Sequence, residues 1–191
     1  MNIGTTSLIQ DMGVNAGLLS FLAALYSIVI SGQRHPDPAV MARRRRWLPW
    51  VTGLMFGVTG ILTMLVPLRL AEGVIVDARL VMAGLAGAYL HPLGALLCAA
   101  VLGAYRLSLG GIGSGPAMVG IALTTTIGWL WQRYRPAFSA LRMPSTLSDT
   151  LWLVGLGLSL AAGGMLAIQT LPPDIARAVT ARSWVAVIVV Y

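Results

Sequence analysis

Long apolar segments separated by short polar ones dominate the chain from residue 14 onward. The apolar segments lie at 14–31, 47–68, 74–90, 93–109, 116–132 and 150–171, and the chain turns apolar again at 184–191. A helix that crosses the hydrocarbon core of a bilayer needs about 20 predominantly apolar residues. The last segment is too short to cross, and we interpret it as the truncated start of a further span. The pattern predicts an all-α membrane protein, with residues 1–191 forming one bundle of six to seven transmembrane helices.

A short central hairpin is expected where the segments 74–90 and 93–109 adjoin. The apolar stretch is interrupted there only by His91-Pro92. Proline disfavours the helical conformation of the preceding residue and supplies no amide donor. Two antiparallel helical arms are therefore predicted, with a tight bend at residues 90–93.

The composition supports a membrane environment. Hydrophobic residues make up 57% of the chain and charged residues only 10%, whereas soluble domains carry about 25% charged residues. The mean hydropathy is +0.81. The lipid bilayer is therefore the expected environment of most of the surface. A soluble catalytic domain is excluded, and the 191 residues are not expected to be an enzyme.

The positive charge indicates membrane orientation rather than nucleic-acid binding. All 13 basic residues are arginines, the net charge is +7, and the arginines lie between the apolar segments. Cytoplasmic loops of membrane proteins are enriched in arginine and lysine. Eight arginines are then expected inside, namely Arg34, Arg43, Arg44, Arg45, Arg46, Arg133, Arg135 and Arg142, and three outside, namely Arg69, Arg177 and Arg182. This asymmetry predicts a multi-pass protein with its N-terminus outside.

Small and aromatic residues suggest how the spans pack and where they meet the membrane surface. Gly53/Gly57 and Gly155/Ser159/Gly163 recur at four-residue spacing, which lets membrane helices approach closely. Aromatic belts at the interface are expected at Trp47 and Trp50, and at Trp129, Trp131 and Tyr134. The hydroxyls of Thr124, Thr125 and Thr126 are expected to bond to carbonyls of their own helix.

Arg79 and Arg106 are the two arginines that are assigned to neither side of the membrane. They flank the bend at similar separations, so they are expected about 20 Å above it on adjacent arms. If the bend lies at the cytoplasmic face, both lie in the outer half of the membrane, with Asp77 near the same level. An arginine at that depth costs about 2.5 kcal/mol or more on insertion scales.

Two interpretations of this set stay open. In the first, the two arginines line a pocket that opens to the outside of the membrane. The forked donors of Arg79 and Arg106 then hold a carboxylate or phosphate. In the second, an arginine–Asp77 pair is a structural clamp, or the arginines snorkel to the headgroups. We favour the first, because two arginines face a single nearby acid.

The glycine-rich loop at 110–115 follows Arg106 directly. It lacks the Lys-Ser/Thr ending of a P-loop, so it is not expected to bind nucleotide. The next helix is expected to start near Pro116, and its free amides would favour an anion; a plain flexible loop is the alternative. The predicted ligand-binding residues are Arg79, Arg106, Asp77, Tyr105, Gly110, Gly111 and Ser114. No catalytic residue, cofactor or metal site is predicted, since the single Cys98 has no ligand partner at suitable spacing.

The stretch from Val66 to about Gly128 resembles the transmembrane sensor region of LytS-type bacterial receptors. The resemblance rests on several short motifs in order: Pro67-Leu68, the run from Gly73 to Arg79, the run from Ala83 to Gly87, Pro92, Tyr105-Arg106-Leu107 and Gly110-Gly111. The chain departs from the family at Leu90-His91, where paired glycines are expected. It departs again at Ala117 and Gly120, where kinase members can carry Cys or Ser.

The resemblance implies a ligand-sensing input module in the bacterial inner membrane, acting as a homodimer. Its output would be a cytoplasmic diguanylate cyclase, because the Asp77-x-Arg79 form looks more like the cyclic-di-GMP members. A LytS-type histidine kinase of a two-component system is the alternative output. Two other classes stay open: a small solute transporter or substrate-binding membrane subunit, and a membrane scaffold without a ligand.

Overall fold

The fold consists of helices and one short β-hairpin. The computed structural model describes residues 13, 17, 20–27, 29, 38–65, 68–71, 74–76, 79–111, 113–139 and 145–170; it does not describe the side chains of 38–45, 68–71, 74–76, 135–139 and 145–146. The elements are α2 (Pro38–Leu65), β1 (Leu68–Ala71), β2 (Val74–Val76), α3 (Arg79–Tyr89), α4 (Pro92–Leu109), α5 (Ser114–Ser139) and α6 (Ser145–Ile168). Residues 20–27 are also helical. The expected segment 184–191 and part of 14–31 lie outside the described residues.

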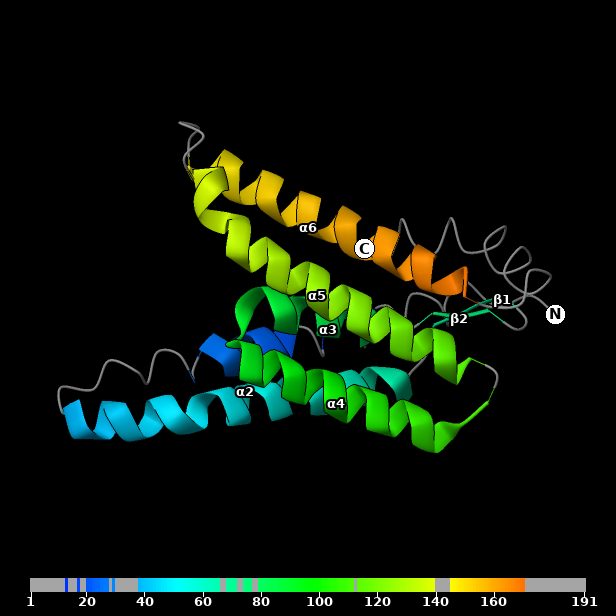
Figure 1. Ribbon diagram of the computed structural model, residues 1–191, viewed down its shortest axis with the longest axis horizontal. Helices are drawn as coiled ribbons and strands as arrows, with labels where there is room; N and C mark the ends of the chain where they lie inside the picture. The colour runs from blue at the N-terminus through cyan, green and yellow to red at the C-terminus, as the bar shows by residue number, and fades with distance from the viewer. Residues whose placement is uncertain are drawn as a thin grey trace.

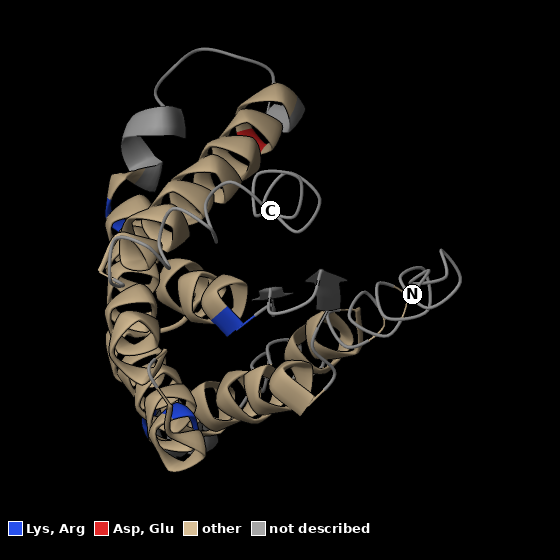
Figure 2. Cartoon of the chain, turned by 90° about the vertical axis from the view of Figure 1, so that its right-hand side faces the viewer, with Lys and Arg blue, Asp and Glu red and all other residues tan. Residues whose placement is uncertain are grey.

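Three helices of the described part are long and apolar enough to cross a membrane. They are Arg46–Leu65 within α2, Pro92–Leu109 and Leu147–Ile168. The 11-residue α3 is only about 16 Å long, roughly half of the hydrocarbon thickness. Very few charged residues interrupt the apolar surface of the described helices (Figure 2). The chain is therefore a helical membrane bundle with a short central helix, and the count of six to seven crossings stays a prediction.

The predicted span 74–90 is wrong at its start. Val74–Val76 is a strand that pairs antiparallel with β1, with Leu68 opposite Val76, and the helix begins only at Arg79. Three consecutive β-branched residues disfavour a helix and favour a strand when a partner is available. The fold is therefore not purely α-helical.

The other helices extend beyond the apolar segments that predicted them. The helix α2 begins at Pro38 rather than residue 47, α5 runs from Ser114 to Ser139 rather than 116–132, and α6 begins at Ser145 rather than residue 150. Apolarity marks only the part of a helix that lipid or protein covers, while backbone hydrogen bonds continue the helix into water.

The bend between the two arms is confirmed. The helix α3 ends at Tyr89 and α4 starts at Pro92. Proline has no amide hydrogen, and none is needed there because the first amide of a helix has no carbonyl acceptor within it. His91 has an extended backbone, with φ −60° and ψ 146°, and its Nδ1 accepts a hydrogen bond of 3.3 Å from the Leu93 amide. His91 is therefore the N-cap of α4.

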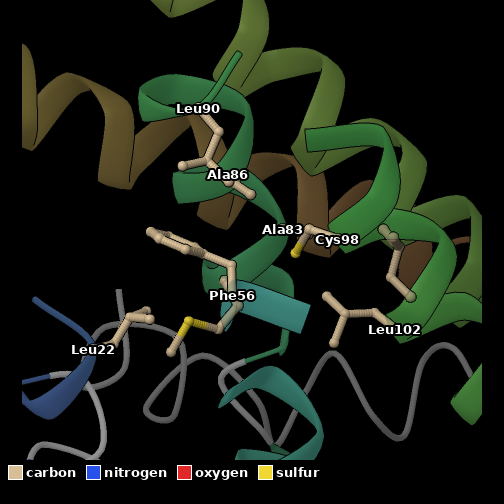
Figure 3. Packing of buried hydrophobic residues seen from close by; sticks show 9 residues of the cluster. Leu22, Phe56, Ala83, Ala86, Leu90, Cys98 and Leu102 are labelled. Atoms are coloured by element: carbon tan, nitrogen blue, oxygen red, sulfur yellow. The ribbon is translucent and has the colours of Figure 1, made fainter. Parts of the chain in front are cut away.

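The short α3 lies at the centre of the bundle. It contacts α2, α4, α5 and α6, while α2 also packs on α4 and α5 packs on α6 (Figure 1). Viewed from the end, the helices form two rows that meet at an angle (Figure 2). The core beside α3 includes Phe56, Ala83, Cys98 and Leu102, whose side chains converge from α2, α3 and α4 (Figure 3).

The predicted small-residue stripes do lie at helix contacts. A Cβ atom on Gly53 would lie 2.5 Å from the Gly94 oxygen of α4. On α6, Gly155 faces Trp131 and Gly163 faces Ile127 of α5. The threonine prediction is also confirmed, because the hydroxyls of residues 124, 125 and 126 donate to carbonyls one turn earlier at 2.7–2.8 Å.

Candidate functional site

Arg79 is the first residue of α3, and its side chain is partly buried. The two-stranded hairpin precedes it directly, which places the start of α3 toward the end of the bundle where the turn between α4 and α5 also lies (Figure 1). Asp77, the predicted acid partner, lies outside the described residues. The structure therefore positions Arg79 at one end of the central helix and leaves its pairing with Asp77 a prediction.

Arg106 is partly buried in the last turn of α4 and contacts the turn that follows. Its Nη1 donates a hydrogen bond of 3.1 Å to the Gly110 oxygen. Its Nη2 would lie 3.0 Å from a Cβ atom on Gly113, so a larger residue there would displace the guanidinium slightly. Within the described part of the chain, the buried Nε has no hydrogen-bond partner. A cation here is also favoured by the negative end of the helix dipole.

The two arginines lie toward the same end of the bundle, on helical segments of unequal length. Ten residues of α3 separate Arg79 from Tyr89, and 14 residues of α4 separate Pro92 from Arg106. At about 1.5 Å per residue, these helical lengths are about 15 Å and about 21 Å. Counting every residue up to the bend as helical gives both lengths as about 20 Å, and the difference arises because Leu90 and His91 lie outside both helices.

The glycine-rich loop is a tight turn between two helices. Gly110 has φ 65° and ψ −159°, and Gly111 has φ 89°, both conformations that side chains with a Cβ rarely adopt. The amide and the hydroxyl of Ser114 both donate to the Gly111 oxygen, at 3.1 and 2.8 Å. Within the described residues the turn is therefore built by internal hydrogen bonds.

The remaining predicted site residue, Tyr105, is partly buried one position before Arg106. Its carbonyl oxygen accepts a hydrogen bond of 2.7 Å from the Ser108 hydroxyl. The structure thus brings Tyr105, Arg106, Gly110, Gly111 and Ser114 together at the α4–α5 turn. Whether Arg79 and Asp77 complete a ligand site with them stays a prediction.

A second polar cluster, which no sequence motif indicates, lies at the C-terminal end of α3. The Tyr26 hydroxyl donates to the Tyr89 oxygen at 3.1 Å, and Gln132 Nε2 donates to the Leu90 oxygen at 3.2 Å. These carbonyls end a helix and have no amide partner within it. Side chains from two other segments therefore satisfy the free carbonyls at the C-terminal end of the central helix.

A row of three aromatic rings adjoins this cluster. The rings of Tyr89 and Trp152 are 5.7 Å apart, and those of Trp152 and Trp131 are 6.0 Å apart, all edge to face. Trp131 also donates its indole hydrogen to the Ser159 hydroxyl at 3.0 Å. Trp131 is therefore a packing residue between α5 and α6, and its place in an interfacial belt stays a prediction. Trp47, Trp50, Trp129 and Tyr134 are exposed, as such belts require.

Among the described residues, no group of three or more His, Cys, Asp or Glu side chains could hold a metal ion. The cysteine Cys98 is buried beside the apolar core residues of α2 and α3.

Comparison with known proteins assigns the chain to a family. The family model described as the 5TMR of 5TMR-LYT matches residues 37–191, which is more than half of the chain and includes every helix from α2 to α6. No curated protein and no solved structure matches. The half-length central helix, the bend at Pro92 and the arginine-bearing turn all lie within the matched residues. The chain therefore belongs to the LytS-type five-transmembrane receptor family, whose domain is a non-catalytic membrane sensor module of signalling proteins.

Proposed function

We propose that this module binds a small anion, of the carboxylate or phosphate class, from the periplasmic side of the bacterial inner membrane. Arg79 and Arg106 hold its charge, and Asp77 orients one of them. Binding shifts the helix packing, and the shift passes to a cytoplasmic output domain, a diguanylate cyclase, in a protein that acts as a homodimer. Orientation with the N-terminus outside places the α4–α5 turn on the periplasmic side.

The observation that carries the proposal is the state of the Arg106 side chain. Its guanidinium is partly buried, one donor is used by the Gly110 oxygen, and the buried Nε has no partner in the described part of the chain. A buried donor without a partner costs about 1–3 kcal/mol, and more when it is charged. A bound carboxylate or phosphate would accept from Nε and one Nη in the paired geometry that a guanidinium favours.

The choice of a diguanylate cyclase as output rests on the Asp77-x-Arg79 form alone. A LytS-type histidine kinase is the alternative output. The central helix α3, which spans only about half of a membrane, is also the kind of interrupted helix found in transporters. Uptake of the anion into sealed proteoliposomes would favour the transporter, whereas binding without uptake supports the sensor.

The test measures binding by the purified chain in lipid nanodiscs, with inorganic phosphate and succinate as probes. A ligand that binds only the folded state raises the unfolding temperature. Arg79→Ala and Arg106→Ala should abolish that rise, since truncating one partner of a buried charged hydrogen bond costs about 2–5 kcal/mol, roughly a 30-fold to several-thousand-fold loss of affinity. Arg→Lys should rescue only partly, because an ammonium lacks the planar fork.

The matched control is Arg133→Ala, since Arg133 is exposed on α5 and lies outside the proposed site. It should bind the probes as the wild type does. Asp77→Asn should weaken binding less than either arginine variant. If Arg79→Ala and Asp77→Ala unfold early to the same extent while the folded fraction keeps its affinity, the set is a structural clamp. If neither probe stabilises the wild type, the anion class is wrong.

A further inference from the structure

The helices α2 and α4 are in direct backbone contact. A Cβ atom on Gly53 would lie 2.5 Å from the Gly94 oxygen, and one on Gly94 would lie 2.8 Å from the Pro49 oxygen. Both distances are shorter than any ordinary contact of a Cβ atom, so only glycines allow the backbones of α2 and α4 to approach this closely. We call α2 and α4 the first body.

The helices α3 and α5 meet the same criterion, and α6 joins them through side-chain contacts; we call these three helices the second body. A Cβ atom on Gly128 would overlap the Gly84 oxygen and lie 2.9 Å from the Ala88 nitrogen; one on Gly87 would overlap the Thr125 oxygen. The backbones of α3 and α5 therefore touch. The helix α6 is tied to α5 by the hydrogen bond of Trp131 and to α3 by the Tyr89–Trp152 ring contact described above.

The seam between the two bodies is different, because side chains fill it. A Cβ atom on Gly60 of α2 would lie 3.4 Å from the Cβ of Met82 of α3, and one on Gly103 of α4 would lie 2.9 Å from the terminal carbon of Met118 of α5. Cys98 of α4 lies in the same seam (Figure 3). Methionine side chains are flexible and adapt to changed spacing. Small displacements across this seam therefore cost less than displacements within either body.

Both connections between α4 and the second body are short turns suited to act as hinges. The first, between α3 and α4, is the bend at His91-Pro92, and we call this end of the bundle the inner end. The second, between α4 and α5 at the opposite, outer end, contains Gly110 and Gly111, both with positive φ. The inner end is also pinned across the seam, because Tyr26 packs its ring on Phe56 of α2, with centroids 5.7 Å apart, and donates its hydroxyl to the Tyr89 oxygen of α3. Hinge motions concentrate in a few such terminal residues.

We infer that the sensor changes state by a pivot of the first body against the second about the His91-Pro92 bend, so that the seam opens and closes toward the α4–α5 turn. Arg79 belongs to the second body and Arg106 to the first. If the proposed function holds, an anion that bridges them draws the outer ends together. The helix α6, which moves with α3, carries the displacement toward its own ends.

The native cysteine provides a reporter for this motion. Cys98 is fully buried, with 0% of its surface exposed, and it is the single cysteine of the chain. If the seam opens transiently, the Cys98 thiol reacts with a membrane-permeant fluorogenic maleimide while the protein stays folded. The rate of labelling then measures the population of the open state.

Two engineered disulfides distinguish motion across the seam from motion within a body. Gly60→Cys/Met82→Cys crosses the seam, and Gly120→Cys/Ala167→Cys joins α5 to α6 within the second body. The corresponding Cβ distances are 3.4 and 3.2 Å, close to the roughly 3.5–4.5 Å of natural disulfides. The two pairs are therefore matched in Cβ separation, and the Leu102 side chain, whose Cδ2 would lie 2.5 Å from a Cβ atom on Gly60, must rotate to admit the first cysteine. Peptide mapping by mass spectrometry verifies that Cys98 stays free after oxidation.

Oxidation of the seam pair should slow Cys98 labelling by about tenfold or more, whereas oxidation of the control pair should leave the rate within about twofold. Each variant is compared with its own reduced form. Gly103→Cys/Met118→Cys is a second seam pair that serves if the first does not fold. Equal slowing by both pairs, no slowing by the seam pair, or a wild-type Cys98 that labels only on unfolding would each overturn the pivot. The experiment contains no ligand, so failure of the anion site would not affect it.

Discussion

Replacement of Gly128 by alanine tests the backbone contact on which the central helix depends. The added Cβ atom would overlap the Gly84 oxygen and lie 2.9 Å from the Ala88 nitrogen and 3.0 Å from the Gly84 carbonyl carbon. All three are backbone atoms and cannot rotate away. Since carbon atoms pack at about 3.5–4.0 Å, the helices α3 and α5 must separate by about 0.5–1 Å.

The cost follows from the attraction that the separation removes. A gap of about 0.5–1 Å forfeits a quarter to a half of the dispersion energy of each contact, which is about 0.1–0.2 kcal/mol per atom pair. For an interface of about 50 such pairs, the loss is about 1–5 kcal/mol. Alanine returns about 1 kcal/mol through its higher helix propensity. The net destabilisation is then about 2 kcal/mol, and the unfolding temperature should fall by about 4–8 °C.

The assay follows thermal unfolding by the loss of the helical circular-dichroism signal, which does not depend on the reactivity of Cys98. Gly115→Ala is the matched control, because it lies in the same helix and a Cβ atom there meets nothing within 4 Å. It should leave the unfolding temperature unchanged or raise it by a few degrees. If Gly128→Ala is as stable as the control, α3 and α5 are not in backbone contact, and the division into two bodies fails with it.

Three further predictions concern the turn, the row of aromatic rings and the topology. Gly110→Ala should lower the unfolding temperature, since its φ of 65° and ψ of −159° belong to a region that costs other residues about 1–3 kcal/mol; an unchanged temperature would contradict this conformation. Trp131→Phe and Ser159→Ala should each cost about 1 kcal/mol, and a double-mutant cycle should find the effects coupled; strictly additive effects would mean that the hydrogen bond contributes nothing. Val40→Cys should react with an impermeant maleimide only after the cells are permeabilised, and labelling of intact cells would reverse the orientation.

The sequence by itself determined the class of the protein and the position of its bend. Apolar segments of membrane-spanning length and a charged fraction of 10% leave lipid as the only suitable environment. Proline at position 92 cannot continue a preceding helix, so the bend at His91 was predictable from one residue. The threonine hydrogen bonds were predictable for the same reason, because their partners lie one turn away in the same helix. Each of these properties depends on residues that are close in the chain.

The properties that depend on distant residues were decided by the tertiary structure. The apolar sequence of residues 74–76 predicts a helix, but these residues form a strand because they pair with residues 68–71. A strand needs hydrogen bonds from another segment, which local sequence does not reveal. Trp131 is a residue type common in interfacial belts, and only the position of Ser159, 28 residues later, shows that it also packs against α6. The spacing of the glycines predicts close helix approach but does not identify the partner helix. The contacts of Gly53 with Gly94 and of Gly128 with Gly84 follow from how the helices are arranged around α3. That arrangement is selected by the fit of whole helix surfaces, a sum of many small contacts that local sequence patterns do not encode.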